Sequence, residues 1–205
     1  MKNGKRYALL LAVLAIALVL VSCKAKPADG GDDKGTTAAQ TTASTTSQST
    51  AGSSTSATVL DVKDFEITPP EGWTADENVQ HFWYAPTYPD DPSNMNIQLV
   101  PVGSDFDEMM NYTADDYKEL YEASFEVGFG EKIPVNVLVC EKTVAAGFDA
   151  MVMALEYELY GTTLFAKQYV IEAGKMGLVV TLTQEADADW EDAFDSCVNG
   201  IVWKY

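Results

Sequence analysis

Positive charge and catalytic bases are scarce in this sequence. Arginine occurs once, at position 6, and histidine once, at position 81. Residues 59–205 hold seven lysines against 28 acidic residues, a net charge near −21. Nucleic acids and phosphate ligands are usually bound by arginine forks in a positive field. The sequence therefore excludes nucleic acid as a partner, and like charge opposes direct adhesion to an anionic surface.

The single histidine also limits the enzyme classes that the chain can belong to. A Ser/His/Asp or Cys/His site needs a base beside its nucleophile, so any such site would depend on His81. No Gly-x-Ser-x-Gly elbow and no Cys-x-x-Cys pair is present in the sequence. We therefore predict no catalytic residue and no cofactor, and expect His81 to be a polar member of a half-exposed strand. A cell-envelope enzyme stays open as an alternative, through a carboxylate pair or His81 in a concave site.

The first 22 residues have the three parts of an export signal. Three basic residues precede an uncharged apolar run at 7–21, and Ser22 then precedes Cys23. The run has fifteen residues, whereas a bilayer-spanning helix needs about 20, which disfavours a signal anchor. "LVSC" at 20–23 resembles the lipobox of bacterial lipoproteins. The resemblance implies that Cys23 carries acyl chains such as palmitate, becomes the first residue after cleavage, and holds the protein on the outer face of a bacterial cell membrane. The long segment that follows Cys23 favours a Gram-positive cell.

Residues 35–58 contain no charge, no aromatic ring and no long aliphatic side chain. Such a segment cannot bury enough surface to order itself, so we predict a disordered tether. The expected organisation is a signal peptide at 1–22, the lipidated cysteine and tether at 23–58, and one globular domain at 59–205. The domain is long enough for a core of its own.

Period-two alternation between glycine turns predicts an antiparallel meander in the second half of the chain. Its strands are expected at 137–145, 151–159, 163–172 and 176–184, after shorter candidates at 65–68, 79–85 and 94–102. Two amphipathic helices are predicted, one capped by Thr113 and one at about 187–199. The predicted fold class is α+β, with an antiparallel sheet of about six strands and helices on both faces.

A family resemblance rests on this order of elements and on one turn. "FEITPPEGW" at 65–73 breaks a short strand with Pro-Pro-Glu-Gly-Trp, and an Asn-rich strand at 94–98, the capped helix, the meander and a closing helix follow. The order resembles that of PsbP-like proteins over roughly 60–205. The resemblance implies an α/β/α sandwich that binds other proteins without performing chemistry. On this basis we expect a binding or accessory module with a protein partner.

The segment 81–89, "HFWYAPTYP", is the main candidate for a binding surface. Four aromatic residues and two following acids are typical of a docking patch, with Trp83, Tyr84, Tyr88, Asp90 and Asp91 as its predicted members. The alternative is that alternate members face the core and that the prolines end an edge strand. A second class of function, a small solute-binding lipoprotein, also stays open, although 147 residues are few for two lobes around a cleft.

Two further patterns concern metal ions and disulfides. Asp90, Asp91 and nearby asparagines offer oxygen ligands suited to Ca²⁺, but the EF-hand spacing fails, so no metal is predicted. Cys140 and Cys197 form the one pair left for a disulfide once Cys23 is lipidated, and export permits the bond. Two buried thiols are the expected state, because a helix stacked on a sheet often holds such residues too far apart.

Overall fold

The structure is a computed structural model that describes residues 62–205. The predicted signal peptide, Cys23 and the tether lie outside the described residues. The helices are α2 (Ser104–Met109), α3 (Ala114–Phe129) and α4 (Glu191–Asn199). The strands are β1 (Asp64–Glu66), β2 (Thr74–Ala75), β3 (Phe82–Tyr84), β4 (Asn94–Pro101), β5 (Val135–Ala145), β6 (Phe148–Leu159), β7 (Thr162–Ala173), β8 (Met176–Glu185) and β9 (Val202–Lys204).

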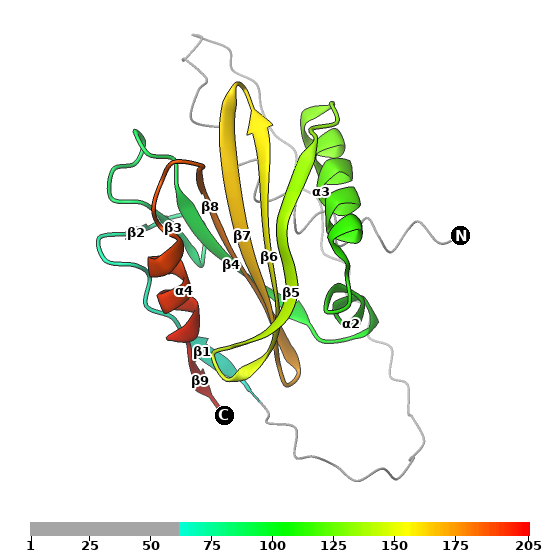
Figure 1. The fold of residues 1–205 in the computed structure, drawn as a ribbon. Coiled ribbons are helices and arrows are strands. Elements are labelled where there is room, and N and C mark those ends of the chain that lie inside the picture. The colour runs from blue at the N-terminus through cyan, green and yellow to red at the C-terminus, as the bar shows by residue number, and fades with distance from the viewer. Residues whose placement is uncertain (1–61) are drawn as a thin grey trace, which may run out of the picture.

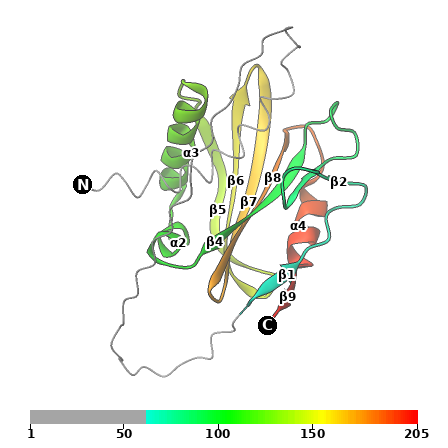
Figure 2. The same ribbon diagram turned by 180° about the vertical axis from the view of Figure 1, so that it is seen from behind.

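Seven strands form one antiparallel sheet in the order β2-β3-β4-β8-β7-β6-β5. Helices α2 and α3 lie on one side of this sheet and α4 lies on the other (Figures 1 and 2). The predicted α+β class with helices on both faces is confirmed. Strand β2 has two residues, too few to be recognised from sequence. With β2 included, this sheet has seven strands, one more than the six expected.

The meander β5–β8 follows the predicted alternation closely. Two-residue turns join its strands, and Gly147, Gly161 and Gly174 adopt φ of 84°, 79° and 70° in them. Ala146 and Tyr160, which precede two of these glycines, are also left-handed, as tight hairpin turns between twisted strands require. Turns of two residues can join only antiparallel strands, so adjacent strands of the meander pair antiparallel.

Helix α3 begins where its cap was predicted. Thr113 accepts a hydrogen bond from the Asp116 backbone N–H at 3.3 Å, and the Asp116 side chain accepts one from the Thr113 N–H at 2.9 Å. This reciprocal capping box satisfies two donors that the first turn leaves open. Tyr117, Tyr121 and Phe125 are buried on the face toward the sheet. The helix ends at Gly130, which is left-handed with φ of 76°.

Helix α4 starts at Glu191, four residues later than the sequence suggested. The Gln184 amide donates to the Ala188 carbonyl at 2.7 Å and its oxygen accepts from the Trp190 N–H at 3.2 Å. This side chain therefore holds 186–190 in a turn instead of a first helical turn. The predicted apolar stripe of α4 is confirmed, because its members pack in the core on this side of the sheet.

The pairing of β1 with β9 and the short helix α2 were not predicted from the sequence. Strands β1 and β9 pair with each other and join the start of the domain to its end, beside α4 in Figure 1. Helix α2 is only six residues long, yet its Phe106 is fully buried. A Cβ added to Gly177 of β8 would lie 2.2 Å from the Phe106 ring, so this glycine makes room for it.

The sheet separates two apolar clusters. One lies toward α4 and is closed by residues of β1 and β9, and the other lies beneath α2 and α3. Within residues 62–205, no helix combines the length and the apolar character needed to cross a membrane.

Candidate functional site

The predicted docking residues lie on β3 and on the loop that follows it, but their side chains diverge. Trp83 lies opposite Met95 of β4 and packs into the α4-side cluster, whereas Tyr84 lies opposite Asn94 on the other face. Both side chains are half-buried, and Phe82 is the deeply buried member of the strand. The three consecutive aromatics therefore lie on both faces of the sheet, as the alternative reading expects, but β3 lies between β2 and β4 and is not an edge strand.

Tyr84 belongs to an aromatic group with Phe82 and Tyr88. Its ring lies 4.9 Å from that of Phe82 and 4.2 Å from that of Tyr88, measured between centroids. The Tyr84 hydroxyl donates to Asp76 Oδ2 at 3.0 Å. Hydrogen bonds from the Asn78 backbone, Tyr84 and the Val79 backbone hold the pKa of Asp76 below its usual range. Tyr88 is 37% exposed, so the group reaches solvent through this ring.

Asp90 and Asp91 are adjacent in sequence but differ in exposure and in hydrogen bonding. Asp90 is exposed on the loop. Asp91 accepts a hydrogen bond from the Ser93 N–H at 2.9 Å and one from the Trp190 indole at 3.0 Å. Burial opposes its charge, but these hydrogen bonds outweigh burial and hold the pKa of Asp91 below its ordinary value. Asp91 therefore fastens the loop to the start of α4.

The oxygen donors around Asp91 do not converge on one point. Asp91 is directed to Trp190, while Asn94 and Asn96 place their side chains on the α3 side of β4. No group of three acidic, cysteine or histidine residues within 62–205 is arranged to hold a metal ion. His81 sits in the turn before β3 at φ of 57°, with its ring 5.5 Å from Phe65 and 6.3 Å from Trp83.

The cysteines of the domain are both free thiols, and the sheet separates them. Cys140 packs on the α3 side, with its Sγ 3.6 Å from the Tyr112 carbonyl oxygen. Cys197 packs on the α4 side, 3.8 Å from the sulfur of Met95. Burial raises the pKa of both, that of Cys197 to about 11. Both thiols are free in the structure, Cys197 buried and Cys140 only partly buried, whereas two buried thiols were expected.

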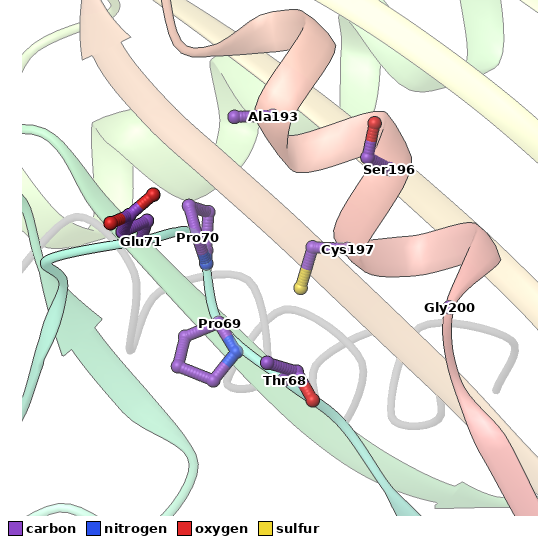
Figure 3. A pocket seen from close by; sticks show the side chains of 8 residues that line it. All are labelled: Thr68, Pro69, Pro70, Glu71, Ala193, Ser196, Cys197 and Gly200. Atoms are coloured by element: carbon purple, nitrogen blue, oxygen red, sulfur yellow. The ribbon is translucent and has the colours of Figure 1, made fainter.

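A hollow of about 390 Å³ lies between α4 and the Pro-Pro-Glu turn at 69–71 (Figure 3). Cys197 points from α4 toward Pro69 and Thr68 in this view. Its raised pKa keeps the thiol protonated near neutral pH, and protonated buried thiols are poor nucleophiles. A second hollow, of about 420 Å³, lies between α2 and the β5–β6 turn region, where Lys142 donates to Asn111 at 2.8 Å. Glu71 of the turn lines the first hollow together with Cys197.

A set of polar side chains instead aligns across the α3 side of the sheet. Asn96 on β4 lies opposite Thr181 on β8, and Thr181 lies opposite Gln168 on β7. Two residues along β4, Asn94 lies opposite Thr183. Directly opposed residues in antiparallel strands have Cβ atoms about 5 Å apart. These five residues, Asn94, Asn96, Gln168, Thr181 and Thr183, form what we call the polar band.

The polar band is buried but only partly hydrogen-bonded. Its exposed fractions are 1%, 6%, 2%, 0% and 1% in the order just given. Gln168 donates to the Thr181 hydroxyl at 2.9 Å, and the Asn94 amide donates to the Pro92 carbonyl at 3.2 Å. Asn94 Oδ1, Asn96 Nδ2 and Thr183 Oγ1 are buried without a hydrogen-bond partner in the described part of the chain. Three such atoms on one face are unusual, because buried polar atoms are nearly always paired.

Aromatic residues bound the polar band at both ends. Phe82 and Tyr84 lie opposite Asn96 and Asn94 at the β3 end. At the other end, Tyr121 of α3 is buried, and its hydroxyl has no hydrogen-bond partner among residues 62–205. Burial and neighbouring tyrosines raise the pKa of Tyr121, and the nearby Gln168 side chain opposes them. Helix α3 packs on β5, at the edge of the sheet far from β3 (Figure 1).

Sequence reasoning missed the polar band, although part of the signal was present. Asn94 and Asn96 are two apart on one predicted strand, and Thr181 and Thr183 are two apart on another. Spacing of this kind places each pair on one face. Only the register between β4 and β8, which are distant in sequence, brings the two pairs together.

Known proteins offer similar folds but no close relative. No protein-family model matches the sequence, and no curated protein does. LpqN of Mycobacterium tuberculosis, described as involved in cell envelope biogenesis, is 15% identical over 69% of this chain and 83% of its own, with a TM-score of 0.47. Cyanobacterial PsbP from Synechocystis is 12% identical over 68% of this chain and 86% of its own, also at 0.47.

A third similar structure comes from Bacteroides thetaiotaomicron, at 11% identity and a TM-score of 0.45 over 69% of this chain. The match spans 45% of that protein, less than half of its length. At identities this low and TM-scores below 0.5, function has to be argued from the residues of the chain itself. The antiparallel sheet with helices on both faces is established by the strand pairings described above.

Proposed function

We propose that this protein is a lipid-anchored, non-catalytic binding module on the outer face of a bacterial cell membrane, with a Gram-positive cell as the more typical setting. Cys23 would carry the lipid, and the tether would hold the domain away from the bilayer. Two acyl chains hold a protein stably where one does so marginally. The acidic domain would contribute no attraction of its own to anionic lipid.

The exposed loop after β3 is the observation that carries the binding role. Tyr88 is 37% exposed there and Asp90 is exposed, beside the aromatic group of Phe82 and Tyr84. Within the sheet, the amides and hydroxyls of the polar band form hydrogen bonds but do not ionise near neutral pH. Elsewhere, the thiols have raised pKa values and His81 rests against aromatic rings. These features support binding over chemistry.

The exposed loop with Tyr88 and Asp90 suits a partner protein, in keeping with an accessory role in an assembly. A small solute, the other candidate partner, would need space at the polar band, whose five residues are 0–6% exposed.

The anchoring half of the proposal is tested by Cys23→Ala, with Cys140→Ala as the matched control. Cells are labelled with a fatty acid and fractionated. We expect the Cys23 variant to lose the label and to keep its signal uncleaved, while the Cys140 variant is labelled and processed normally. Unchanged labelling and processing in Cys23→Ala would contradict lipid anchoring.

The partner-protein half is tested by crosslinking in cells from a photoreactive residue at position 88. The same probe at position 144, exposed on β5 at the opposite edge of the sheet, is the control. We expect a discrete crosslinked protein from position 88 that is absent from position 144. Identical patterns from the two positions would remove the case for docking at this loop.

A further inference from the structure

The loop between β2 and β3 and the loop after β3 form one continuous surface, because Tyr84 contacts both. The Tyr84 hydroxyl donates to Asp76 Oδ2 of the first loop at 3.0 Å, and the Tyr84 ring lies 4.2 Å from the Tyr88 ring of the second, measured between centroids. The surface lies on the β2–β3 side of the sheet, away from α3 (Figure 1). We call it the tyrosine–acid surface, and its exposed or half-buried members are Asp76, Glu77, Val79, Tyr84, Tyr88 and Asp90.

Hydrogen bonds fix the shape of both loops in the free protein. Asp76 accepts from the backbone N–H groups of Asn78 at 2.7 Å and of Val79 at 2.9 Å. In the second loop, the Thr87 carbonyl accepts from the Asp90 N–H at 2.9 Å. A surface that already has its shape loses less conformational entropy when a partner binds.

The tyrosine–acid surface is acidic, and no basic residue lies near it in sequence. Residues 64–103 contain seven acidic residues and no lysine or arginine. The ion pairs of Lys132, Lys167 and Lys204 lie elsewhere, with acids of α3, α4 and β1. The domain as a whole carries a net charge near −21, so its field has the same sign as the surface. A second copy of this chain and an anionic lipid would both be repelled.

The side chains of the surface fit a long cationic side chain in particular. The face of a tyrosine ring attracts an ammonium or guanidinium group, and a carboxylate forms charge-assisted hydrogen bonds with the same group. Tyr88 is 37% exposed and lies two residues before the exposed Asp90. Val79 is 46% exposed, and the apolar stems of lysine and arginine pack along such residues.

We propose that the tyrosine–acid surface binds a segment of the partner protein that carries several lysine or arginine residues. This inference rests on the proposed docking function of the loop and names the chemistry of its partner, and it is independent of the lipid anchor. Steering by the acidic field speeds the encounter with such a segment, and the rings and carboxylates of the two loops set where it docks.

The first test titrates the full-length protein, in the uncharged detergent dodecyl maltoside, with three capped peptides of equal length. One alternates lysine with alanine, and the other two carry glutamine or glutamate in place of lysine. We expect the lysine peptide to bind at low salt and to lose most of its affinity at high salt, where exposed charges are screened. The glutamine peptide should bind at least about tenfold more weakly, and the glutamate peptide should not bind.

Variants of equal charge locate the binding. Glu77→Gln/Asp90→Asn should weaken the lysine peptide by about tenfold, and Tyr88→Leu by about threefold. The matched control is Glu141→Gln/Asp149→Asn, which removes the same two charges from exposed positions on β5 and β6, at the other edge of the sheet. Its affinity should stay close to that of the unchanged protein. An equal loss in both double variants would show that only the overall charge acts, and would overturn the site.

Crosslinking in cells from position 88 separates this inference from the docking function on which it rests. We expect the crosslinked partner to disappear in Glu77→Gln/Asp90→Asn and to persist in Glu141→Gln/Asp149→Asn. A partner captured equally by both variants, together with no binding of the lysine peptide, would overturn the basic segment and leave protein docking intact. A crosslink of the chain to a second copy of itself would overturn the assignment as well. Failure of the docking function itself would show as no crosslinked partner in the unchanged protein.

Discussion

Strands β4 and β8 present different chemistry on their two faces. Toward α4 they place Met95, Ile97, Leu178, Val180 and Leu182, all in one closely packed apolar cluster. Toward α3 the same strands place asparagines and threonines, several with unpaired polar atoms. Apolar burial contributes about 25 cal/mol per Å², whereas an unpaired buried polar atom costs about 1–3 kcal/mol. The α4 face therefore stabilises the domain, whereas the unpaired atoms of the polar band lower its stability.

The largest effect is expected on the α4 face. Phe194 is fully buried against Tyr169, with ring centroids 5.9 Å apart. Phe194→Ala should lower the unfolding free energy by about 3–5 kcal/mol, because it removes apolar contacts and leaves a cavity. Urea unfolding followed by tryptophan fluorescence measures the loss. Exposed Val144→Ala is the control, and an equal effect from both would contradict a tight α4-side core.

A smaller effect is expected where α2 meets β8. A Cβ at Gly177 would overlap the buried Phe106 ring, so Gly177→Ala should cost about 1–3 kcal/mol through displaced packing. Gly103→Ala is the matched control, since nothing lies within 4 Å of a Cβ there. Thermal unfolding compares the two. Equal melting temperatures would mean that Phe106 of α2 does not pack tightly against β8.

Within the polar band, the paired threonine should matter more than the unpaired one. Thr181→Val removes the acceptor of the 2.9 Å bond from Gln168 and strands that amide. We expect a loss of about 1–2 kcal/mol in urea unfolding. A variant as stable as the unchanged protein would show that Gln168 has another partner, and the description of the band would need revision.

The smallest effect concerns pH. The pKa of Asp91 is lowered in the fold, so its ionised form stabilises the native state above the unfolded pKa of about 3.9. That contribution is lost as pH falls through the lower folded value. Because Asp91 is only partly buried, it should amount to less than about 1 kcal/mol. Asp91→Asn should narrow the difference in stability between pH 6 and pH 3, and an unchanged difference would contradict the role of Asp91.

Local patterns in the sequence predict the elements but not their lateral order. The Thr113 cap and the glycine turns of the meander involve residues within four positions of one another, and both are confirmed. The start of α4 was placed too early because Gln184, outside the helix, holds the preceding turn. Pairing of β4 with β8 joins segments about 80 residues apart, and no local pattern encodes it. The candidate site depends on that pairing.

The most direct test of the contrast between the two faces is the stability of the Asn96→Leu/Thr183→Val double variant. Replacing unpaired buried polar groups by apolar groups of similar shape should be neutral or stabilising. Urea unfolding measures the difference. We expect an unfolding free energy at least equal to that of the unchanged protein. A double variant that is several kcal/mol less stable would show that these polar groups stabilise the fold and would contradict their description as unpaired.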